Sequence, residues 1–184
     1  MKKDESRLWK VGIISTAKDL GDVRKNISKM LTKMKFTPCM FESNYTQPPN
    51  AQIEQVCIAN IRKLDYVILL IGDRYGSLLP DNATSQTMNE YNEAVKCDIP
   101  ILKIVRKDVF ELYNMAQHDY DEKEYNKLLQ KIIRDSKKKG CETNQNELDG
   151  VIKFIGKISS QNIMINKVDD FSDLKRIEEL ISNF

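Results

Sequence analysis

The chain has 184 residues, of which 41% are apolar and 30% are charged, the composition of a globular protein rather than a disordered one. Its net charge of +2 is too small to indicate a nucleic acid or an anionic membrane as the partner. No run approaches the roughly 20 consecutive apolar residues that cross a bilayer, and the charged amino end is not a signal peptide. We therefore expect a cytoplasmic protein that folds as one domain over residues 1–184.

The chain contains four cysteines, Cys39, Cys57, Cys97 and Cys141, and one histidine, His118. No two cysteines have the C-x-x-C spacing of a metal site, so we predict no metal. The pattern favours free thiols over disulfides, with Cys57 and Cys97 as small buried residues.

The first part of the chain alternates short apolar runs with helical patterns. Val11–Ile14 predicts a buried strand, and the apolar residues between Val23 and Met34 then recur at helical spacing. Thr37–Phe41 predicts a second strand. A second helix is predicted from Ala51 to about Leu64, where apolar residues again recur at helical spacing.

The most apolar run of the chain, Tyr66–Ile71, predicts a strand in the middle of a parallel sheet that is covered on both faces. Gly72 ends this strand, and a polar loop over Asp73–Gln86 follows. The pattern then predicts a helix from about Met88 to Cys97 and a fourth strand over Ile99–Val105.

The last third of the chain is less regular. Tyr125–Ile133 predicts a helix, and Val151–Ile158 predicts another. Ile163–Ile165 reads as a short fifth strand, and Asp170 or Ser172 is a candidate cap for a final helix. Strands that alternate with helices imply an α/β fold, a doubly wound parallel sheet of five strands in the flavodoxin-like order 2-1-3-4-5.

Ligands of such folds bind past the carboxyl ends of the strands, here between the first and third strands. The loops there carry residues suited to a phosphorylated ligand: Ser15, Thr16, Asp19, Gly72, Arg74, Tyr75 and Gly76. Glycine lets the backbone approach a ligand, arginine pairs with phosphate, and a tyrosine ring contacts a base or sugar. A structural interpretation also stands, in which the hydroxyls start a turn, Asp19 caps a helix and the glycines are ordinary turn residues.

A candidate carboxylate opens the helix after that loop, in the segment Thr87–Ala94. Glu90 could act as a nucleophile or stabilise the cationic sugar that forms when an N-glycosidic bond breaks. The spacing Thr87-x-x-Glu90 is equally that of a capping box, in which Thr87 caps the helix and Glu90 bonds back to it. Glu93 is expected to face solvent. Dinucleotide, P-loop and nucleophile-elbow motifs are absent from the sequence.

Three segments, Ile14–Leu20, Asp65–Ser77 and Thr87–Ala94, resemble a bacterial family of unknown function that is usually placed near TIR domains and nucleoside 2-deoxyribosyltransferases. The stretch Asn162–Leu180 resembles the end of such domains. The resemblance thus covers nearly the whole chain and implies a TIR-like form of the flavodoxin-like fold.

The resemblance also implies a chemistry. Deoxyribosyltransferases carry a T-x-x-E-x-x-x-A pattern, matched here by Thr87, Glu90 and Ala94, and TIR domains cleave NAD with a glutamate on the equivalent helix. Tyr91 and Thr87 would then line the substrate site. Members of the family often have an aromatic residue where Gln86 stands and an acid where Met88 stands.

These features lead to one main hypothesis and two alternatives. The main one is a TIR-like hydrolase that cleaves or transfers the N-glycosidic bond of a nucleotide, most simply NAD as substrate with no resident cofactor. The resemblance implies a role in antiviral defence signalling, with self-association or a separate effector protein. The first alternative is a non-catalytic module that senses a nucleotide or binds a protein. A phosphate-binding response domain ranks last, because Ser15 and Thr16 replace the acids expected after the first strand.

Overall fold

The computed structural model describes residues 7–40, 57–80, 84–118, 120–160 and 164–184. Its centre is a sheet of five parallel strands in the order β2-β1-β3-β4-β5, as predicted. The strands are β1 (Lys10–Ile14), β2 (Thr37–Cys39), β3 (Tyr66–Ile71), β4 (Ile101–Arg106) and β5 (Ile165–Val168).

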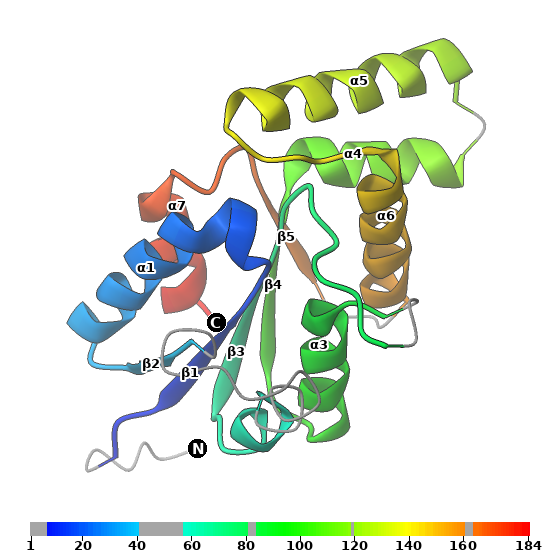
Figure 1. Cartoon of the computed structure of the whole chain (residues 1–184). Helices are drawn as coiled ribbons and strands as arrows, with labels where there is room; N and C mark the ends of the chain where they lie inside the picture. The colour runs from blue at the N-terminus through cyan, green and yellow to red at the C-terminus, as the bar shows by residue number, and fades with distance from the viewer. Residues whose placement is uncertain (1–6, 41–56, 81–83, 119, 161–163) are drawn as a thin grey trace.

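Helices cover both faces of this sheet (Figure 1). Their bounds are α1 (Ala17–Lys33), α3 (Gln86–Lys96), α4 (Lys107–Gln117), α5 (Glu122–Lys138), α6 (Gln145–Ser159) and α7 (Leu174–Ser182). Helices α1 and α7 pack on one face, and α3, α4, α5 and α6 contribute to the core on the other. Residues 57–61 are helical and form the end of the predicted second helix, whose beginning lies outside the described residues.

Strand β3 shows why the sheet sits at the centre. Val67, Leu69 and Ile71 project into the core on the α3 and α6 face, whereas Ile68 and Leu70 project into the core under α1 and α7. Each of these side chains is almost fully buried, and burial of one such side chain stabilises a fold by about 1.5–3 kcal/mol. The continuous apolar run is therefore required by a strand that has no solvent-facing side.

The structure corrects the sequence prediction at several elements. Helix α4 was missed, because only Val109 and Leu112 are buried in it and its N-cap, Arg106, makes no side-chain capping bond. Strand β5 lies further along the chain than predicted. Helix α7 is capped by Asp173, whose side chain accepts a hydrogen bond from the Arg176 backbone N–H, and not by the predicted Asp170 or Ser172.

The four cysteines are free thiols, as expected. Cys57 is buried, but Cys97 is exposed because it follows the last residue of α3. Across the described residues, no helix combines the length and the apolar character needed to span a bilayer.

Candidate functional site

Helix α3 begins two residues earlier than the sequence predicted, and this changes the interpretation of Glu90. Ser85 is the N-cap, and its side chain accepts a hydrogen bond from the Met88 backbone N–H at 3.2 Å. Thr87 is therefore inside the first turn, and Glu90 lies beyond the position from which a glutamate reaches back to the cap. The predicted capping box does not form.

Glu90 is a buried carboxylate, with 8% of the residue exposed. The side-chain N–H of Gln86, one turn earlier, donates a hydrogen bond to Glu90 Oε1 at 3.2 Å. Acidic side chains are seldom buried without a partner or a role, and Gln86 supplies a group that orients this one. The capping explanation therefore does not apply to Glu90, and its role at the site stays a prediction.

The prediction that Glu93 faces solvent is wrong. Glu93 is buried, and the Arg62 Nε–H donates to its Oε1 at 2.6 Å. This hydrogen bond holds the pKa of the Glu93 carboxyl below its ordinary value. Arg62 follows the helical residues 57–61 before β3, so the pair ties α3 to that connection and gives Glu93 a structural role.

Three segments of the predicted crevice meet at Gly76. Its backbone has φ +94°, a conformation that side chains of L-residues rarely adopt. A Cβ at this position would lie 3.0 Å from Thr16 Cγ2 and 3.4 Å from Thr87 Oγ1. The loop after β1, the loop after β3 and the first turn of α3 therefore converge. This is the place, past the carboxyl ends of the first and third strands, at which the sequence predicted a crevice.

The loop after β1 is held by side chains of α1. Thr16 is the N-cap of α1 but makes no side-chain capping bond; its hydroxyl instead donates to Asp19 Oδ1 at 2.5 Å. Ser15 is buried, and its carbonyl accepts a bond from Arg24. Gly72 leaves room for the Asp19 carboxylate, because a Cβ there would lie 2.9 Å from Asp19 Oδ2.

A cavity of about 460 Å³ opens on the α1 side of these loops, a volume suited to a small molecule. Among the predicted site residues, only Asp19 lines it. Its other charged residues include Asp73 and Arg106, which form an ion pair at 3.4 Å. Arg106 was not predicted as a site residue, although it stands at the carboxyl end of β4, where ligands of such folds bind. No group of three or more potential metal-ligating side chains occurs in the described part of the chain.

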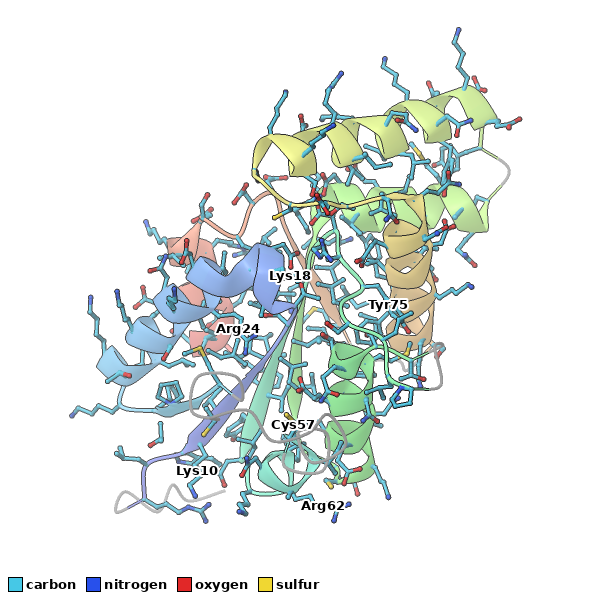
Figure 2. The ribbon with its side chains drawn as sticks, viewed as in Figure 1. Lys10, Lys18, Arg24, Cys57, Arg62 and Tyr75 are labelled. Atoms are coloured by element: carbon cyan, nitrogen blue, oxygen red, sulfur yellow. The ribbon has the colours of Figure 1, made fainter. Side chains whose placement is uncertain are left out.

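Arg74 and Tyr75 turn away from this cavity towards α6. Arg74 Nη2 pairs with Glu147 Oε1 at 2.8 Å, and Arg74 Nη1 donates to the Glu142 carbonyl at 3.1 Å. The ring of Tyr75 packs against Gly150 of α6, and Figure 2 shows Tyr75 beside this helix. The Tyr75 hydroxyl contacts Met88 Sδ at 3.3 Å. Arg74 is thus already engaged by a carboxylate within the chain.

Tyr91 belongs to the core. It is fully buried and packs edge to face on Phe154, with 5.5 Å between ring centroids, and burial raises the pKa of its phenol to about 12. The buried Lys103 Nζ lies 5.6 Å from the centre of the same ring and donates to the Ile158 carbonyl in the last turn of α6. Tyr91 therefore anchors the helix that carries Glu90.

The fold defined by this sheet and these helices is that of a TIR domain. The structure matches the TIR domains of the activated Roq1 resistosome directly recognizing the pathogen effector XopQ, with a TM-score of 0.57 and 10% sequence identity over 95% of this chain and 98% of that one. The family described as "Domain of unknown function (DUF4062)" matches residues 10–153, so the chain belongs to that family. No curated protein matches the sequence.

Two glycines of α6 test the packing of Tyr75. A Cβ at Gly150 would lie 2.6 Å from Tyr75 Cγ, whereas a Cβ at Gly156 would meet nothing closer than Tyr113 Cε2 at 3.5 Å. We expect Gly150→Ala to lower the free energy of unfolding by about 1–3 kcal/mol through overpacking. Gly156→Ala should raise it by up to about 1 kcal/mol through helix propensity. Chemical denaturation of both variants measures the difference, and equal effects would contradict this packing.

The pH dependence of stability tests the environment of Asp19. Burial raises the pKa of its carboxyl from 3.8 to about 6, against the lowering effect of the Thr16 hydrogen bond. The folded state then retains a proton that the unfolded state releases, so ionisation of Asp19 lowers stability as pH rises between these values. At neutral pH this cost is roughly 3 kcal/mol, at 1.36 kcal/mol per unit.

Asp19→Asn removes this titration while its amide oxygen can still accept from Thr16. We expect the free energy of unfolding of the wild type, measured from pH 4.5 to 7.5, to fall relative to that of Asp19→Asn as pH rises. A constant effect of the amide cancels in this comparison. Asp22→Asn is the control, because the Asp22 side chain lies on the same helix and is 94% exposed. Parallel curves for wild type and Asp19→Asn would refute the raised pKa.

Proposed function

We propose that this chain cleaves or transfers the N-glycosidic bond of a nucleotide, with NAD as the first candidate substrate and Glu90 as the catalytic carboxylate. The observation that carries the proposal is the buried Glu90 carboxylate on α3, which accepts a hydrogen bond from Gln86. Glu90 takes no part in capping the helix, because Ser85 is the cap. Its helix begins where the loops after β1 and β3 converge.

The chemistry needs one carboxylate close to the sugar. When the bond between ribose and a base breaks, positive charge develops at the anomeric carbon, and an ionised carboxylate either stabilises this charge or forms a covalent bond with the carbon. The base leaves with the electron pair of the broken bond, and water or a second acceptor completes the reaction. The Gln86 amide orients the carboxylate for either route by donating to Glu90 Oε1.

The convergence at Gly76 supplies the groups that would hold the rest of the nucleotide. Thr87 brings its hydroxyl group to it and Thr16 its methyl group, and the backbone there carries no side chain. A relation to nucleoside deoxyribosyltransferases and a role in bacterial antiviral signalling are parts of the same proposal. The neighbour TIR domains come from a resistosome, which supports self-association or an effector partner for this chain as well.

Release of nicotinamide from NAD tests the proposal. We expect turnover by the wild type and a loss of about a hundredfold or more in Glu90→Gln, since the amide keeps the shape but cannot carry the charge. Glu93→Gln is the matched control on the same helix; it removes the charge that pairs with Arg62 and should lower the melting temperature while the folded protein keeps its turnover. Equal turnover by wild type and Glu90→Gln would disprove the role of Glu90.

A nucleotide-sensing module without catalysis is the second candidate, and Met88 favours it. Where the resemblance implies an acid, this chain has a thioether, and the Tyr75 hydroxyl contacts its sulfur. In this case NAD or a related nucleotide should raise the melting temperature without being consumed. The expected stabilisation is about 2.7 kcal/mol at a hundredfold excess over Kd. Turnover that Glu90→Gln abolishes would exclude this candidate.

A further inference from the structure

Glu147 on α6 collects the polar groups of the loop after β3. Its Oε1 accepts from Arg74 Nη2 at 2.8 Å, and its Oε2 accepts from the backbone N–H groups of Tyr75 at 2.6 Å and Gly76 at 3.2 Å. Arg74 and Glu147 are both mostly buried, with 13% and 19% of their side chains exposed. One carboxylate therefore binds three consecutive residues of the loop, and charge-assisted bonds of this kind are about twice as strong as neutral ones.

The position of Glu147 in α6 shows that these bonds are not local helix chemistry. Asn144 is the N-cap, and its side chain accepts from the Glu147 backbone N–H at 3.0 Å. Asn144-x-x-Glu147 thus has the spacing of a capping box, in which the glutamate would bond back to the cap residue. The Glu147 carboxylate bonds instead to residues 71 to 73 positions earlier in the chain.

The same loop is attached at its other side to the helix that carries Glu90. The Gln86 backbone N–H donates to the Ser77 carbonyl at 2.9 Å, and the Tyr75 hydroxyl contacts Met88 Sδ. Gly76 packs against Thr87, one turn before Glu90. A displacement of the loop from Glu147 would therefore move the first turn of α3, including Gln86, whose side chain orients Glu90.

We infer that Glu147 is a positioning residue for the Glu90 site: by binding Arg74, Tyr75 and Gly76 it sets the place of the loop against which the first turn of α3 packs. The inference rests on the proposed function for its catalytic consequence, but the positioning itself is a structural claim that can be measured without turnover. Glu147 touches no substrate in this scheme. It acts through the loop and through Gln86.

Glu147→Gln and Asp149→Asn form a matched pair, since both convert an acid of α6 into its amide. Glu147 bonds to the loop after β3, whereas Asp149 serves as the control on the same helix. In Glu147→Gln we expect the Tyr75 and Gly76 amides to exchange hydrogen about tenfold faster, the factor for one typical hydrogen bond. The carbon-13 signal of the Glu90 carboxyl should shift as well. Asp149→Asn should change neither. If Glu147→Gln does not fold, Arg74→Lys, which keeps the charge but loses the fork, tests the same contact.

Turnover then separates positioning from general stability. In folded Glu147→Gln we expect kcat for NAD cleavage to fall by up to about a hundredfold with little change in KM, the signature of a misplaced catalytic group. Unchanged kcat, or an unchanged Glu90 signal, despite faster exchange of the loop amides would overturn the inference. If the wild type does not cleave NAD, the proposed function fails, and the Glu90 carboxyl signal alone decides whether Glu147 positions the site.

Discussion

The burial of β3 on both faces is the constraint from which the rest of the structure follows. Ile68 and Leu70 fill one half of the core while Val67, Leu69 and Ile71 fill the other, so this strand has no surface at which a polar side chain could meet solvent. Polar chemistry is thereby confined to the loops at the strand ends. The loop that leaves β3 at its carboxyl end is the one that Asp19, Thr16 and Thr87 contact.

That loop is held from three directions. Gly72 is covered by Asp19 from the start of α1, Asp73 pairs with Arg106 at the end of β4, and Glu147 binds the next residues from α6. Each contact requires a different chemical feature: absence of a side chain, a buried ion pair, and a carboxylate that accepts backbone N–H groups. The loop consequently lies between the cavity beside α1 and the part of the carboxyl edge beside α3, the helix that carries Glu90.

The parts of this arrangement that the sequence predicted are those that depend on a local pattern of residues close together in the chain. Tyr66–Ile71 was predictable to the residue because a strand buried on both faces needs an unbroken apolar run. The cap of α3 was not, since Ser85 and Thr87 are both good caps and only the packed helix distinguishes them. The pairs Arg62–Glu93 and Arg74–Glu147 join residues 31 and 73 positions apart, and no local pattern encodes such partners.

Asp19 and Glu90 are two of the carboxylates near the carboxyl edge, and their hydrogen bonds differ. Asp19 Oδ1 accepts from Thr16, while Oδ2 is buried without a hydrogen-bond partner among the described residues. A buried oxygen without a hydrogen-bond partner costs stability. Glu90, by contrast, is oriented by a side chain of its own helix, which needs no rearrangement of either loop. The ionisation of Asp19 is therefore coupled to the loop after β1, whereas the hydrogen bond from Gln86 couples Glu90 to the first turn of α3, which packs against Gly76.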